Sequence, residues 1–289
     1  MELNLVRYAW HTAEPVHAVL YYAPETQAAT APLALPGRWM WYFGCRAAPL
    51  GAVGAAAATS VFYHLAPAMV ARSVPALWDH ATPHDFLRAR LTAMDTALHR
   101  LAGPVLGSPG LARAAELATA AATVVAGAGG RPLGAANAAL PVPDEPHLAL
   151  WQALTTLREY RGDGHAVVLA GQEIEPCAAH VLAAASGRSP RSDAEKYHKW
   201  TEDQWAAALG ELVHRGWLRE DGTLTAAGAL VRERIETDTD RLAARPYRAL
   251  GQTRTEELVA CVRPFADLVM SAGAVPVPNP VGFDWPPRR

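Results

Sequence analysis

The chain has 289 residues, of which 51% are hydrophobic and 19% are charged, and its formal net charge is −2. This length provides ample apolar material for a core and room for two domains. The near-neutral charge excludes the overall basic balance that is typical of nucleic-acid-binding proteins. The longest apolar tracts, 50–58 and 117–128, are alanine-rich and far shorter than the roughly 20 residues of a membrane span.

The N-terminal segment lacks the order of a secretory signal, since Glu2 and Asn4 stand where basic residues and then an apolar run are needed. Three cysteines, Cys45, Cys177 and Cys261, lie far apart and form no CxxC pair. A zinc module and a disulfide framework are therefore both disfavoured. We expect a cytoplasmic protein with no membrane partner, whose cysteines are small buried thiols.

The N-terminal half predicts helices separated by proline and glycine turns. Apolar periodicity favours a helix over 7–23, and Pro32 and the Pro36–Gly37 pair then break the chain. Further helices are predicted over an alanine-rich stretch that ends at Tyr63, over a short segment within 70–83, and over 84–101 and 111–126.

Aromatic residues gather between positions 39 and 43, where Trp39, Trp41, Tyr42 and Phe43 shortly precede Arg46. Large apolar side chains at this density ordinarily belong to the core. The alternative is the wall of a pocket, because rigid aromatic rings offer a large contact area with few dihedral angles to fix. Both interpretations stay open.

Prolines at 141, 143 and 146 mark the expected boundary between an N-terminal helical domain, residues 1–143, and a C-terminal domain, residues 144–289. A helix over 147–160 is then expected to end at Arg161–Gly162, where Asp163 caps a second helix that ends near 171. A third helix is predicted over 175–185. Three short helices at this spacing indicate a helix-turn-helix unit, which a polar linker over 187–199 follows.

The stretch 200–243 predicts a winged helix. Thr201 is an expected N-cap for a helix that ends near Arg215. Residues 217–219 and 223–225 are predicted to form two short strands around the Asp221–Gly222 turn, before a closing helix over 226–242. The expected fold class is mainly α: an N-terminal helical domain, a helix-turn-helix unit and a winged helix with a short two-stranded β-wing.

The densest group of chemically capable side chains comprises Arg158, Glu159, Arg161, Asp163 and His165. The two arginines share a helix face, and guanidinium groups bind carboxylates or phosphates through paired hydrogen bonds. Asp163 could orient His165 or raise its pKa, which would suit acid–base chemistry. The alternative is a structural network, in which the two carboxylates neutralise the arginines at the seam between the domains.

Our hypothesis is a small-molecule site between the two halves, in an enzyme or a sequestering protein of bacterial specialised metabolism. His165 is the candidate catalytic residue. The expected ligand-binding residues, suited to an anionic or aromatic ligand, are Arg46, Arg158, Arg161, Asp163, Tyr42, Tyr63 and Trp78. The cofactor is unknown, and no metal site is predicted, because His80 and His84 with Asp79 and Asp85 lack a third fixed partner. The common hydrolase, nucleotide-binding and zinc-protease motifs are absent from the sequence.

Over about residues 9–282 the chain resembles the actinobacterial SCO6745 family of helix-turn-helix proteins, through CRAAPLGAV, RGDGHAVVL and WTEDQWAAALGELVHRGWLREDGTLTAAG. The residues that match its motifs are Arg46, Pro49, Gly51, Arg131, Pro132, Arg158, Arg161, Asp163, His165, Thr237, Asp238, Asn279 and Pro280. The resemblance implies a fold and supplies no reaction. Residues 200–242 are also similar in pattern to MarR-type regulators.

A ligand-responsive transcriptional regulator is the alternative function. The helix before the expected wing would enter the major groove of DNA, but it begins with Glu202 and Asp203, which repel phosphates. Between 193 and 241, eleven acidic residues oppose seven basic ones, which gives a local charge of −4. DNA is therefore a disfavoured partner. A homodimer could still assemble a basic face from Lys196, Lys199, Arg188 and Arg191.

Overall fold

The computed structural model describes residues 1–283 and 285–287, which contain fourteen α-helices joined by short 3₁₀ turns and one π-helical turn, Ala194–His198. The α-helices are α1 Leu3–Tyr22, α2 Pro24–Thr30, α3 Arg38–Ala47, α4 Ala55–Val61, α5 Pro67–Ala71, α6 Pro83–Ala102, α7 Pro109–Thr123, α8 Pro132–Ala138, α9 Pro146–Gly171, α10 Pro176–Ala185, α11 Arg191–Asp193, α12 Glu202–His214, α13 Ala226–Leu250 and α14 Gln252–Ser271. No helix in these ranges is long and apolar enough to cross a bilayer.

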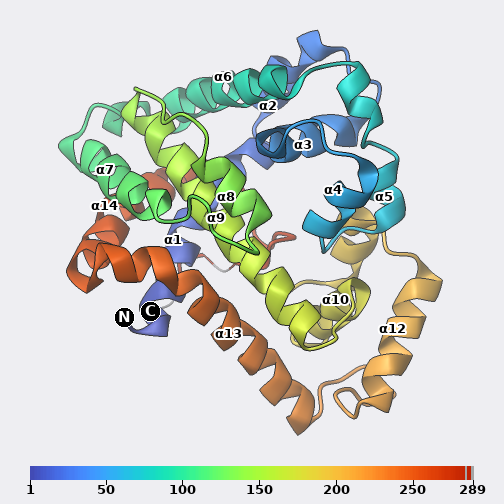
Figure 1. Ribbon diagram of the computed structural model, residues 1–289. Coiled ribbons are helices and arrows are strands. Elements are labelled where there is room, and N and C mark those ends of the chain that lie inside the picture. The colour runs from blue at the N-terminus through green and yellow to red at the C-terminus, as the bar shows by residue number, and fades with distance from the viewer. Residues whose placement is uncertain (284, 288–289) are drawn as a thin grey trace.

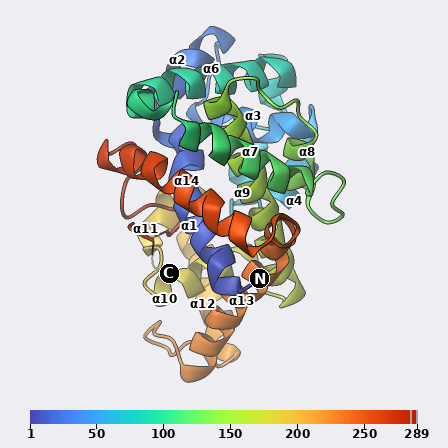
Figure 2. The same cartoon turned by 90° about the vertical axis from the view of Figure 1, so that its left-hand side faces the viewer.

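The longest helix, α9, lies at the centre of the molecule (Figure 1). It has 26 residues and is therefore about 39 Å long. It packs against α1, α6, α7, α8 and α13, and Figure 2 shows α14 lying across α1 on the adjoining side. Residues 147–157 are buried without interruption. A helix that is buried on every face needs neighbours all round, so α9 fixes where the other helices can lie.

The predicted break at Arg161–Gly162 is wrong, because α9 continues through it. Glycine inside a helix costs about 1 kcal/mol relative to alanine, so local propensity alone favours the break. Neighbouring elements instead pack closely against this part of α9: Leu242 and Arg131 lie 3.5 and 3.6 Å from the position that a Cβ would take on Gly164. Tertiary packing thus outweighs propensity, and Asp163 lies inside a helix and not at an N-cap.

The predicted two-stranded β-wing is also wrong, although the mainly α class is confirmed. Leu218 and Leu224 form an isolated antiparallel bridge, and no strand occurs among the residues that the structure describes. The Arg219 N–H donates to the Thr223 carbonyl at 2.9 Å. The arms are too short to continue a ladder, because Thr225 already serves as the N-cap of α13.

The other helices agree with the prediction at some points and differ from it at others. The predicted Thr201 cap of α12 is confirmed, since its hydroxyl accepts the Gln204 N–H in a capping box. The segment expected as a polar linker contains α11 and the π turn, and α13 continues through Pro246 to Leu250. No helix was expected where α3, α8 and α14 lie. The division at 143/144 stays a prediction, and residues 284, 288 and 289 of its second part lie outside the described residues.

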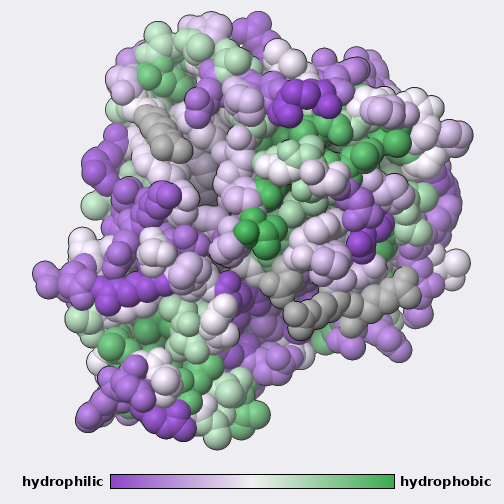
Figure 3. All heavy atoms as spheres, turned by 180° about the vertical axis from the view of Figure 1, so that it is seen from behind, coloured by the Kyte–Doolittle hydropathy of each residue, from purple (hydrophilic) through white to green (hydrophobic). Residues whose placement is uncertain are grey.

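The surface seen from behind is largely hydrophilic (Figure 3). Apolar residues gather at the upper right and in the lower-left lobe, which carries α12, and hydrophilic side chains border both groups. Large apolar side chains that are individually exposed include Val142, Val167, Leu230 and Val277. Scattered residues of this kind are normal for a folded chain and carry no functional argument.

Close packing of α8 on α9 gives a first prediction. A Cβ on Gly134 would stand 2.7 Å from the Tyr160 Cα. Backbone atoms cannot move aside as a flexible side chain can, so we expect Gly134→Ala to lower the free energy of unfolding by about 1–3 kcal/mol. Urea unfolding followed by circular dichroism measures the loss.

As a control, the added Cβ of Gly210→Ala on α12 meets nothing within 4 Å, so this variant should leave stability unchanged or raise it by up to about 1 kcal/mol. Unaltered stability of Gly134→Ala would contradict the packing.

Candidate ligand-binding site

A cavity of about 380 Å³ lies between α1 and α3 on one side and α9, α10 and α13 on the other. This volume is typical of small-molecule sites, which span about 300–1,000 Å³. Nine aromatic residues, five arginines, three carboxylates and four histidines line it. The lining is therefore apolar over much of its area and carries charge at a few defined places.

Seven of the eight predicted site residues lie together in this lining: Arg46, Arg158, Arg161, Asp163, His165, Tyr42 and Tyr63. Trp78 does not. Its indole N–H donates to the Val53 carbonyl at 2.9 Å, and its ring packs edge-on against Phe86. The open question about the aromatic cluster is also answered in part, because Trp39, Trp41 and Tyr42 line the cavity whereas Phe43 is fully buried.

One face of α9 supplies the charged wall. Arg158, Gly162, His165 and Leu169 follow one another at three- or four-residue spacing, which places them on one side of a helix. This shared face exists only because α9 is continuous. Gly162 lacks a side chain in the middle of it and so leaves space beside the guanidinium of Arg158.

Glu159 anchors two arginines in the part of the cavity next to α3. The Arg46 guanidinium donates to both carboxylate oxygens, at 2.9 and 2.8 Å, and Arg158 donates at 3.1 Å. Arg46 also donates to the Tyr42 hydroxyl at 2.7 Å. Burial opposes ionisation of Glu159, but the two guanidiniums outweigh it and lower its pKa to about 2. Glu159 is thus a carboxylate that holds both arginines in place.

In another part of the lining, three arginines share Glu236 of α13. Arg188 and Arg232 lie 2.8 and 2.9 Å from its carboxylate, and Arg161 lies at 3.8 Å. Arg161 also donates to Asp240 at 2.6 Å. Burial again opposes ionisation, yet the neighbouring guanidiniums lower the pKa of Glu236. One carboxylate cannot neutralise three cations, so positive charge is concentrated here.

Carboxylates behind the lining compensate this charge only in part. Glu14 is the partner of Arg158 at 3.4 Å, but burial raises its pKa and so favours its neutral form. Asp240 is shared between Arg161 and Arg7, each at 2.6 Å. The cavity therefore retains an excess of positive charge that an anion can balance.

The hydrogen bonds of His165 fix its tautomer. The Thr239 hydroxyl donates its one proton to the Ile235 carbonyl at 2.7 Å. Because that oxygen can then only accept, His165 Nδ1, at 2.8 Å, must carry the proton. Burial lowers the pKa of His165 to about 4, which the nearby Glu236 offsets only in part. His165 is thus neutral near pH 7 and has a free lone pair on Nε2.

Asp163 has a different role from the one expected. Its carboxylate accepts the Gly134 N–H at 2.8 Å, in the first turn of α8. It therefore ties α8 to α9, whereas Thr239 orients His165. Burial raises the pKa of Asp163 to about 7.

Sequence reasoning missed three further histidines of the cavity, His64, His180 and His198. His64 stacks on His165 with ring centroids 5.3 Å apart, and the ring centroids of His180 and His198 are 4.3 Å apart. Burial lowers the pKa of all three, to about 3 for His198. The His198 Nδ1 is buried without a hydrogen-bond partner. The four imidazoles come from four separate segments, so no sequence spacing could have revealed their cluster.

A buried carboxyl with a raised pKa should destabilise the fold where it must ionise. Asp163 has a pKa near 3.8 in the unfolded chain and about 7 in the folded protein. Its burial therefore costs no folding free energy below about pH 3.8, and the cost grows until about pH 7. Asn keeps an oxygen that can accept the Gly134 N–H. We therefore expect Asp163→Asn to raise the free energy of unfolding at pH 8 by roughly 2–4 kcal/mol. Urea denaturation from pH 4 to 8 measures the gain, which should shrink toward pH 4. A gain independent of pH would show that the carboxyl charge is not its source.

Comparison with known proteins places this chain in a family. Neither a search of the curated proteins nor one of the solved structures found a match. The profile of a helix-turn-helix family matches residues 6–276, which include every residue of the cavity lining except Pro280 and Val281. The match thus covers both halves and the site between them, and the chain belongs to this helix-turn-helix family.

Proposed function

We propose that the protein binds an anionic aromatic small molecule in the cavity. The sharing of Glu236 by Arg161, Arg188 and Arg232 carries this proposal. A carboxylate, phosphate or sulfonate on the ligand would supply the missing negative charge and accept charge-assisted hydrogen bonds. Trp10 supports an aromatic ligand beside that group, because its ring lies 4.4 Å from the Arg161 guanidinium carbon and 5.7 Å from that of Arg188.

His165 contributes recognition in this proposal and no proton transfer. A base with a pKa of about 4 is mostly unable to take a proton from a ligand near pH 7, where catalytic bases are tuned to the operating pH. Its free Nε2 would instead accept a hydrogen bond from a ligand hydroxyl or N–H. A sequestering or sensing protein of bacterial specialised metabolism, close to the SCO6745 group, is therefore favoured over an enzyme.

A fluorescence titration with anilinonaphthalene sulfonate, an anionic aromatic probe, tests the proposal. We expect one binding site per chain and clearly weaker binding of the uncharged N-phenylnaphthylamine. Arg188→Gln should weaken the sulfonate probe about tenfold or more, the loss expected for one charge-assisted hydrogen bond. Glu236 keeps Arg232 and Arg161 as partners in this variant, so the fold should survive.

Arg88→Gln is the matched control, because Arg88 pairs with Asp85 on the surface of α6. It should bind the probe as wild type does. Equal affinity of the charged and uncharged probes, or of Arg188→Gln and wild type, would refute the proposed anion site.

Membership of a helix-turn-helix family favours DNA binding as the second candidate. The exposed residues of α12 argue against it, since they include Glu202 and Asp203 and no lysine or arginine. Arg191, beside the start of α12, is held by Glu195 and Glu202. We expect no gel shift with duplex DNA at low salt. A salt-sensitive complex would instead support the regulator.

A further inference from the structure

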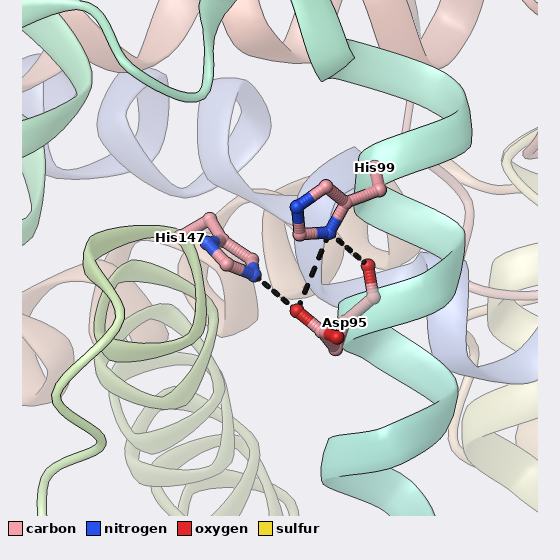
Figure 4. A group of neighbouring side chains, drawn as sticks. All are labelled: Asp95, His99 and His147. Carbon is pink, nitrogen blue, oxygen red and sulfur yellow. Dashed lines mark hydrogen bonds and ion pairs between the residues drawn. The ribbon is translucent and has the colours of Figure 1, made fainter.

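Asp95, His99 and His147 form a cluster outside the cavity (Figure 4). Asp95 and His99 lie four residues apart on α6, and His147 lies in the first turn of α9. One ligand atom from each residue lies within 4.8 Å of the other two. The Asp95 Oδ1 is 2.7 Å from His147 Nε2 and 3.3 Å from His99 Nδ1. Figure 4 shows both imidazoles pointing toward the carboxylate.

We propose that this cluster binds a divalent transition-metal ion, with Zn²⁺ as the best match. Two imidazole nitrogens and one carboxylate oxygen are a ligand set that zinc accepts, whereas Mg²⁺ and Ca²⁺ prefer oxygen ligands alone. Three protein ligands leave one tetrahedral position for water. His99 and Asp95 are about half exposed, at 57% and 46% of their side chains, so an ion and its water can reach the site from solvent.

Two of the three distances between ligand atoms are close to those around a bound ion. Ligand atoms around a tetrahedral zinc lie about 3.3 Å apart, which is the separation of Asp95 Oδ1 from His99 Nδ1. The 2.7 Å contact with His147 would have to widen by roughly 0.6 Å on the same criterion. Asp95 can make this shift because it is half exposed, whereas His147 is buried and provides a fixed reference.

The protons of the cluster also permit metal binding. His99 Nδ1 donates to the Asp95 backbone carbonyl at 2.9 Å, so in the absence of metal that nitrogen carries the proton. The same holds at His147, whose Nε2 donates to the Asp95 carboxylate at 2.7 Å. Coordination therefore requires the other tautomer at both histidines, with the proton on Nε2 of His99 and on Nδ1 of His147. At His99 this exchange costs little, since more than half of the side chain is exposed and water can accept a hydrogen bond from Nε2. The neighbouring cation Arg100 is held by Glu25 through two hydrogen bonds and is not directed at the cluster.

The metal site is independent of the cavity. Arg158, the first residue of α9 in the cavity lining, lies eleven positions after His147, or about 16 Å along the helix. A bound ion would clamp α6 to the first turn of α9. We expect it to stabilise the fold without altering probe binding in the cavity.

Isothermal titration of untagged, metal-free protein with Zn²⁺ tests the proposal, and Co²⁺ absorption reports the coordination geometry. We expect one Zn²⁺ per chain, the visible bands of tetrahedral Co²⁺, and a higher midpoint of thermal unfolding with Zn²⁺. His99→Ala removes one ligand nitrogen, and Asp95→Asn replaces the carboxylate by an uncharged amide. Each should weaken Zn²⁺ binding at least about tenfold. Asn keeps an oxygen near His147 and so limits the damage to the fold.

His84→Ala is the matched control, because His84 is an exposed histidine on the same helix. It should bind Zn²⁺ as wild type does and show the same Co²⁺ spectrum. The proposal is overturned if His99→Ala binds Zn²⁺ as tightly as wild type. Loss of affinity in His84→Ala equal to that in His99→Ala would likewise overturn it, since binding would then be non-specific.

Discussion

The buried ion pair between Arg46 and Glu159 is the interaction on which the rest of the site depends. It joins α3, near the start of the chain, to the centre of α9 through two hydrogen bonds. A buried carboxylate is costly unless its partners satisfy it, and Glu159 is satisfied by two guanidiniums. The pair therefore fixes the separation of the two walls. Replacement of such pairs by apolar residues can leave stability unchanged in other proteins, so stability alone does not explain their presence here.

The two carboxylates that line the charged walls have unequal surroundings. Glu159 has two arginines as direct partners, whereas Glu236 has three. Our proposal that one cavity combines a structural network with a binding surface rests on this difference. The sequence left two interpretations of the charged stretch open, a structural network and a ligand site. The contacts of Glu159 match the structural network, and the group around Glu236 is where we propose that an anion binds.

The sequence indicated residues of the candidate site where the signal was local. The stretch from Arg158 to His165 is dense in charge, and both of its arginines line the cavity, although they pair with different carboxylates. Glu236 and the three further histidines escaped notice because only the tertiary fold brings them there. Trp78 lies outside the cavity lining, because its indole N–H donates to the Val53 carbonyl. The helical class followed from apolar periodicity, whereas the wing depended on pairing between arms too short to sustain a ladder.

The π-helical turn at Ala194–His198 has a consequence for how the cavity tolerates change. A π turn contains one residue more than the α-helical turn it replaces. Deletion of one residue there would leave an α-helical turn and shift the register of the residues inside it by one position. Tyr197 and His198, which lie inside the turn and line the cavity, would then take new positions on it although both side chains were retained. The shape of this wall thus depends on the length of the segment as much as on its residue types.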